Sequence, residues 1–149
     1  MVASTPSFLL PLSLVWRTER TDPTLEVGPT LRHAKEALEA LGAAVEPADG
    51  GGELRFTGLG RSSRPAPTIA GRVVVERHGE RIAVTVQGSF LQHLATLLVF
   101  TIGFRLMGFA FLISDVLGAL VVLDALVSAW RLRSVARRAL AFGPLKRAV

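Results

Sequence analysis

The stretch FLISDVLGALVVLDALVSAW, from Phe111 to Trp130, decides the architecture of this chain of 149 residues. It is long and apolar enough to cross a membrane, yet it carries two carboxylates, Asp115 and Asp124. On membrane-insertion scales, the twelve Phe, Leu, Ile and Val residues of the segment 109–130 would roughly balance two aspartates at the centre of a helix. Each aspartate lies about six residues from an end of this segment, so its cost is smaller. The sequence therefore predicts a transmembrane helix that contains two acidic positions.

The apolar region begins well before this stretch. Residues 94–130 comprise 37 residues with three charges, which is too long for one perpendicular crossing of about twenty residues. Because Arg105 would be costly in mid-membrane, a loop is expected at Phe104–Gly108. We predict a transmembrane helical hairpin, with helices at about 90–104 and 109–130.

A single crossing from Leu106 to Trp130 is the alternative. It would place the N-terminal domain across the membrane, although the start of the chain does not resemble a signal peptide. No positive charge precedes its apolar run, and Pro11 interrupts that run. The hairpin keeps both ends of the chain on one side of the membrane.

The net charge of +5 comes from the C-terminal tail and does not indicate a nucleic-acid-binding surface. Residues 1–93 hold ten basic and ten acidic side chains, whereas residues 131–149 hold six basic and no acidic ones. Basic residues that follow a membrane helix mark its cytoplasmic end, and Trp130 is suited to the membrane interface. We therefore expect an integral protein of the cell membrane, inner or plasma, with cytoplasmic N- and C-termini and no nucleic acid as partner.

The basic juxtamembrane tail, residues 131–149, has the pattern of an amphipathic helix. Its apolar residues share one face: Leu132, Val135, Ala136, Ala139 and Phe142. Its arginines are placed to meet anionic lipid headgroups beside the membrane helix. The candidate headgroup-binding residues are Trp130, Arg131, Arg133, Arg137 and Arg138.

Residues 1–88 have the pattern of a small α+β module. Apolar residues alternate from Phe8 to Trp16 with the period of a half-buried strand, and Pro11 favours an edge position in the sheet. A helix is expected from about Thr30 to Leu41, because its apolar residues share one face and Gly42 can end it.

The rest of the module is predicted to form four further strands. Strand patterns occur at Ala43–Glu46 and Glu53–Gly58, and a β-hairpin follows in GRVVVERHGERIAVTVQ. With His78-Gly79 as a two-residue turn, opposite charges and apolar residues face each other. The predicted pairs are Arg77 with Glu80, Glu76 with Arg81, Val75 with Ile82, and Val73 with Val84. We predict an antiparallel sheet of β-α-β-β-β-β order with its single helix across one face, followed by the transmembrane hairpin (89–130) and the tail.

Antiparallel alignment of the two membrane helices gives each acid a polar neighbour. The candidate polar residues of the hairpin are Asp115, Asp124, His93, Gln92, Thr101 and Arg105. Asp124 is expected to bond His93 or Gln92, and Asp115 to bond Thr101 or Arg105, as contacts that hold the hairpin together. The two acids lie on opposite helix faces, so they are not an acid/base dyad. An ion or proton path is the alternative.

A row of small residues also occurs in the second membrane helix. Ala110, Ser114 and Gly118 are spaced by four residues, which suits close helix packing or self-association. We expect a protein partner or a homo-oligomer.

Catalytic, cofactor-binding and metal-binding patterns are absent from the sequence. The three histidines lie in different elements, cysteine is absent, and no phosphate loop or nucleotide fingerprint occurs. We expect a non-enzymatic small integral membrane protein that presents its cytoplasmic α+β module for protein interaction or scaffolding. The alternatives are an accessory subunit of a transporter that uses Asp115 and Asp124, and a membrane-anchored enzyme of unidentified chemistry.

Overall fold

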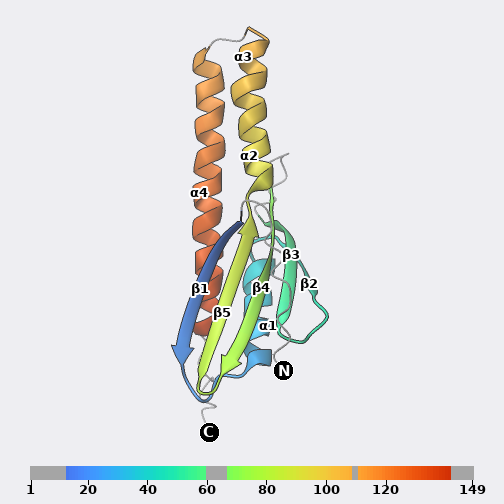
Figure 1. Ribbon diagram of the computed structural model, residues 1–149, viewed down its shortest axis with the longest axis vertical. Coiled ribbons are helices and arrows are strands. Elements are labelled where there is room, and N and C mark those ends of the chain that lie inside the picture. Colours follow the sequence, from blue (N-terminus) through green and yellow to red (C-terminus); the bar gives the residue numbers. More distant parts are fainter. Residues whose placement is uncertain (1–12, 60–66, 109–110, 142–149) are drawn as a thin grey trace.

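The computed structural model describes residues 13–59, 67–108 and 111–141. They form a five-stranded antiparallel sheet from which a helical hairpin projects (Figure 1). The strands are β1 (Ser13–Thr21), β2 (Ala44–Pro47), β3 (Glu53–Leu59), β4 (Ile69–His78) and β5 (Arg81–Ser89), in the spatial order β1-β5-β4-β3-β2. The helices are α1 (Val27–Glu39), α2 (Leu91–Leu98), the π-helix η1 (Val99–Gly103), α3 (Phe104–Leu106) and α4 (Phe111–Ala141).

The predicted α+β class and the element order of the sheet are confirmed. Helix α1 begins three residues earlier than expected, with Pro29 in its first turn, and ends near Gly42, which has a positive φ of 82°. Its inward face packs on the sheet through Thr30, Ala34 and Leu38, which are buried.

Strand β1 lies at an edge of the sheet, as predicted. It continues past the expected end at Trp16 because its backbone pairs with β5 as far as Thr21 opposite Arg81. The residues that suggested its first half, from Phe8 to Leu12, lie outside the described residues.

The predicted pairing of the β4–β5 hairpin is wrong by two residues. Val75 faces Val84, and His78 faces Arg81, so the two-residue turn is Gly79-Glu80. Gly79 has a φ of 63°, a conformation that would cost about 1–2 kcal/mol at a residue with a side chain. Because exposed cross-strand charge pairs contribute only about 0.2–1 kcal/mol, the glycine determines the turn. A two-residue shift leaves the same side chains facing inward, so the predicted apolar face is correct.

The first helix of the hairpin runs without interruption from Leu91 to Leu106 through α2, η1 and α3. It ends at the predicted break, where Gly108 has a φ of 76° and its N–H donates to the Arg105 carbonyl. With 16 residues this helix is shorter than a usual membrane span. Among the described residues, only α4 is long and apolar enough to cross a membrane, over Leu112–Ala141.

Helix α4 does not end at Trp130 but continues along the sheet to Ala141 (Figure 1). Its last third packs with α1 on the same face of the sheet, and the Arg20 guanidinium of β1 donates to the Leu140 carbonyl at 2.7 Å. The core residues contributed by this part are Leu132, Val135, Ala136, Ala139 and Leu140.

The assignment of this apolar face to lipid headgroups is therefore wrong. An amphipathic pattern requires an apolar surface to cover, and the sheet supplies that surface here. The module thus has two helices on one face where the sequence predicted one. Phe142, which was counted in the same face, lies outside the described residues.

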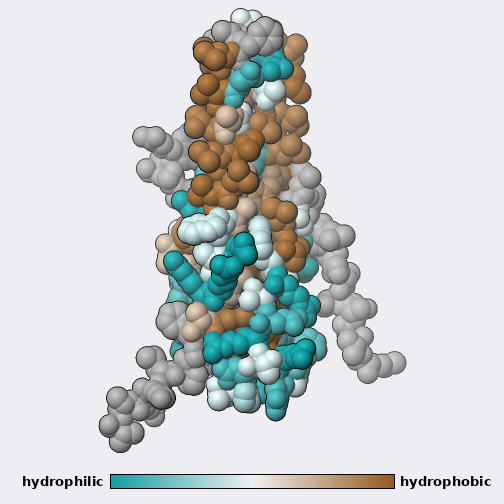
Figure 2. Space-filling view, turned by 90° about the vertical axis from the view of Figure 1, so that its left-hand side faces the viewer, coloured by the Kyte–Doolittle hydropathy of each residue, from teal (hydrophilic) through white to brown (hydrophobic). Residues whose placement is uncertain are grey.

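The molecule divides into an apolar half and a polar half (Figure 2). All large apolar side chains that are exposed in the described residues lie on the hairpin between Leu91 and Trp130, apart from Leu14 and Val15. Those two residues stand at the start of β1, where Ser13 pairs with Ser89 directly below α2. These exposed apolar side chains form a belt that continues from the hairpin to the end of the sheet that adjoins it.

Candidate functional site

The base of the hairpin, where α2 leaves β5 and passes α4, contains a hydrogen-bonded His–Asp pair. His93 Nε2 lies 2.9 Å from Asp124 Oδ2, and His93 was one of the two partners expected for Asp124. The histidine side chain is buried, at 4% exposed, whereas the aspartate side chain is 43% exposed. Because an ionised carboxylate can only accept hydrogen bonds, His93 Nε2 is assigned as the donor.

The other ring nitrogen of His93 is not paired. Within the described part of the chain, Nδ1 is buried and has no hydrogen-bond partner. Phe90 packs against the ring in a tilted arrangement, with 5.5 Å between the ring centroids. Buried polar atoms in proteins are nearly always satisfied, so this nitrogen requires an explanation.

Gln92, the other partner expected for Asp124, turns away from the hairpin. Its Oε1 accepts hydrogen bonds from the backbone N–H and the hydroxyl of Thr68, at 2.9 and 3.0 Å. Gln92 thereby ties the start of α2 to the residue that precedes β4.

The second acid is paired near the tip of the hairpin. Arg105 Nη2 donates to Asp115 Oδ1 at 2.9 Å, and both side chains are exposed. Thr101, the alternative partner, contributes its backbone carbonyl to a different contact. The hydroxyl of Ser114 donates to the carbonyl oxygens of Phe100 at 3.2 Å and Thr101 at 3.5 Å, within the π-helical segment.

The small residues of α4 are used within the hairpin. Ser114 is fully buried, and a methyl group added at Gly118 would lie 3.4 Å from Leu97 Cδ1. These two positions therefore allow the first helix of the hairpin to approach α4 closely. They do not support the alternative use of the small-residue row, which was self-association of the protein. Ala110 lies outside the described residues.

The candidate headgroup-binding residues lie where α4 passes from the hairpin to the sheet. Trp130 is 69% exposed at the lower limit of the apolar belt. Arg133, Arg137 and Arg138 are exposed one to two turns farther along, and Arg131 is partly buried. Their binding to lipid stays a prediction.

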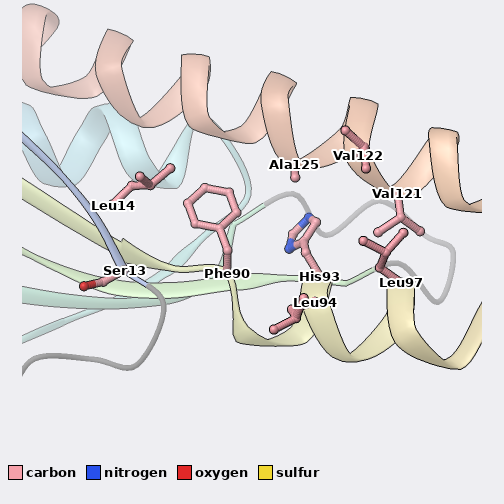
Figure 3. A pocket seen from close by; sticks show the side chains of 9 residues that line it. All are labelled: Ser13, Leu14, Phe90, His93, Leu94, Leu97, Val121, Val122 and Ala125. Atoms are coloured by element: carbon pink, nitrogen blue, oxygen red, sulfur yellow. The ribbon is translucent and has the colours of Figure 1, made fainter. Parts of the chain in front are cut away.

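A pocket of about 370 Å³ adjoins His93 at the hairpin base (Figure 3). It lies between the start of β1, α2 and α4, and apolar side chains such as Leu14, Phe90, Leu97 and Ala125 form most of its wall. This pocket was not predicted from the sequence. Its residues come from three segments that are distant in the chain and mostly apolar, so no local motif marks them.

The described residues contain no cluster of three or more His, Asp or Glu side chains that could hold a metal ion. Comparisons of the chain with protein families, curated proteins and solved structures found no match. The arrangement of the residues is therefore the basis for any functional proposal.

Proposed function

We propose that the helical hairpin inserts into a membrane and holds the α+β domain at the cytoplasmic surface, where the domain acts as a non-enzymatic binding module for a protein partner. The exposed apolar belt carries this proposal. An apolar surface this large on a monomer marks a membrane or protein interface. It covers both helices from Leu91 to Trp130, which favours a bilayer over a single docking partner.

The polar contacts of the hairpin agree with a bilayer position. Arg105 and Asp115 lie near the tip, and His93 and Asp124 lie near the base, so the middle of the hairpin carries no ionisable side chain. At 1.5 Å per residue, the segment 111–130 spans about 30 Å, the thickness of the hydrocarbon core. The first helix spans only about 24 Å, so local thinning of the bilayer or the length of the Arg105 side chain must compensate.

The continuity of α4 supports a fixed presentation of the domain. Its upper part belongs to the apolar belt and its lower part to the core of the α+β domain, with no linker between them. A module held in this way keeps a constant orientation toward the membrane surface. The outer face of the sheet and the edges β1 and β2 are then available to a partner in the cytoplasm.

The transporter-subunit alternative has less support. Each acid already has a partner within the chain, and the two pairs lie at different levels of the hairpin. A proton path would need further polar groups from another subunit.

Two single-cysteine variants test the topology, because the chain contains no native cysteine. Met107→Cys lies at the hairpin tip and Glu80→Cys at the opposite end of the sheet, and both sites are exposed. We expect a membrane-impermeant maleimide to label the first variant in intact cells and the second only after lysis. Labelling of Glu80→Cys in intact cells would overturn the orientation, and release of the protein by alkaline carbonate would overturn the insertion.

The binding role needs a separate test. Crosslinking in intact membranes, followed by purification of the full chain, should recover a defined partner attached to the α+β domain. Recovery of crosslinks to lipid alone would argue against a protein-binding module.

A further inference from the structure

The pocket at the hairpin base has the size and lining of a ligand site. Its volume of about 370 Å³ lies within the range of about 300–1,000 Å³ that is usual for small-molecule pockets. Such pockets are mostly apolar with a few polar groups that orient the ligand. This pocket fits that description, because its polar side chains are Ser13 and His93.

His93 supplies a hydrogen-bonding atom of defined character. In a neutral imidazole that donates from Nε2 to Asp124, the Nδ1 atom carries a lone pair and accepts hydrogen bonds. Figure 3 shows one ring nitrogen turned toward α4, which carries Asp124, and the other turned toward Phe90 along the pocket wall. The group that would satisfy Nδ1 must therefore be a donor, such as a hydroxyl.

We propose that the pocket binds the hydrocarbon chain of a lipid that carries a hydroxyl, and that this hydroxyl donates to His93 Nδ1. The chain lies against the apolar wall formed by Leu14, Leu97 and Ala125. The source of the ligand rests on the proposed membrane insertion, which places the pocket at the boundary between lipid headgroups and acyl chains. A hydroxyl next to a hydrocarbon chain occurs at that depth.

Phe90 controls access to the nitrogen. Its ring packs on His93, and Nδ1 is covered before a ligand arrives. The ligand reaches Nδ1 when the Phe90 side chain turns to another rotamer. Phe90 is only partly buried and packs at the margin of the domain core, so this rotation gives up contacts at that margin.

The proposal can be tested on the purified full chain in mild detergent. The probes are a photoactivatable long-chain primary alcohol and the methyl ether of the same chain, which has no O–H to donate. We expect the alcohol to label the pocket segments of α2 and α4 about threefold to tenfold more efficiently than the ether, the advantage that one net hydrogen bond provides. Equal labelling by the two probes would overturn the role of His93 Nδ1.

Three variants separate the hydrogen bond from the pocket. His93→Lys keeps an N–H donor for Asp124 but has no acceptor atom, so labelling by the alcohol should fall to the level of the ether. Ala125→Phe fills the pocket and should reduce labelling by both probes, whereas Ala119→Phe, an exposed alanine of the same helix outside the pocket, should not. Unchanged labelling of Ala125→Phe would overturn the pocket as the binding site.

Failure of this inference can be told apart from failure of the proposed function. The labelling is measured in micelles and does not depend on topology. If alkaline carbonate releases the protein while the alcohol keeps its advantage, the anchoring proposal is wrong and the binding site is supported. If the protein stays in the membrane in carbonate and the two probes label equally, the role of His93 Nδ1 is wrong and the anchoring proposal is supported.

Discussion

The two parts of α4 both carry leucines and valines, but in opposite surroundings. In the part from Phe111 to Trp130 the leucines and valines mostly point outward, as Leu126 does at 63% exposed. In the part from Arg131 to Ala141 they are buried, as Leu132 is at 0% exposed. The neighbouring surface differs: the lower part meets the apolar face of the sheet, whereas the upper part faces only the other helix of the hairpin among the described residues. One continuous helix can thus belong to a protein core and to a proposed membrane anchor.

The largest effect is expected from removing a core side chain in the lower part. Leu132→Ala leaves a cavity between α4 and the sheet and should reduce the free energy of unfolding by about 2–5 kcal/mol. Denaturant unfolding of the purified chain in micelles, followed by a signal from the sheet, measures this. The matched change Leu126→Ala in the upper part leaves no enclosed cavity and should cost less than about 1 kcal/mol. Equal losses would break the comparison between the two parts.

A smaller loss of stability is expected from adding a methyl group to β5 where it packs against Leu132. A Cβ atom at Gly88 of β5 would lie 2.5 Å from Leu132 Cδ1, so Gly88→Ala should destabilise the domain by about 1–3 kcal/mol. In the Leu132→Ala background the closest clash is removed and only Ile69 Cγ2, at 3.0 Å, still crowds the added methyl, so the loss should shrink and the two changes should not add. Gly28→Ala in α1, where a Cβ would meet nothing within 4 Å, is the control and should not destabilise. If the losses of unfolding free energy from Gly88→Ala and Leu132→Ala simply added, the packing of Leu132 against Gly88 would be contradicted.

In the upper part, the largest single polar contribution is expected from Asp124. Asp124→Leu removes the partner of buried His93 and should destabilise the hairpin by about 0.6–2 kcal/mol, the usual range for polar contacts between membrane helices. Asp124→Asn keeps a hydrogen-bonding side chain and should lose less. Unfolding in mixed micelles titrated with a denaturing detergent compares the variants. An equal loss in both would show that the carboxylate charge, and not the hydrogen bond, stabilises the pair.

The smallest effect is expected at Asp22, in the polar half of the molecule. The hydroxyl and the N–H of Thr24 donate to its Oδ1 at 2.6 and 3.0 Å, and these bonds, with the nearby charge of Arg20, lower the pKa of Asp22 below its ordinary value of 3.8. A lowered pKa in the folded state contributes stability above pH 3.8, and this contribution is lost as the pH falls through the lowered pKa.

Thr24→Val removes the first of these bonds and provides the test. The difference in unfolding free energy between the variant and the parent should be present at neutral pH and narrow in the acid range below pH 3.8. A difference that stays constant with pH would mean that the hydroxyl stabilises the turn without acting through the carboxylate.

Patterns within single segments predicted most of the elements. The alternation before Trp16, the apolar face of the helix near Leu38 and the glycines at the turns were sufficient to place the strands and α1 within a few residues. The contacts of Asp124 with His93 and of Asp115 with Arg105 were among the expected pairs, because antiparallel helices of known lengths match residues by depth. The role of these pairs is untested.

Two errors show where segment patterns are insufficient. The β4–β5 register was inferred from weak charge pairs, although the backbone requirement at Gly79 outweighs them. The face around Val135 was assigned to lipid, although it packs on the sheet. An amphipathic pattern indicates that one face of a helix will be covered by an apolar surface, but it does not indicate whether that surface is lipid or protein.

By itself, the sequence determined the order of strands and helices along the chain, the apolar face of each, and the position of the break between the two apolar helices. These follow from periodicity, glycine and charge, which act over a few residues. Only the tertiary structure decided that α4 passes from the hairpin into the domain core and that Ser13, His93 and Ala125 meet around one pocket. Such contacts join segments that are more than 25 residues apart in the chain, so they depend on the competition between surfaces in the folded molecule and not on any local preference.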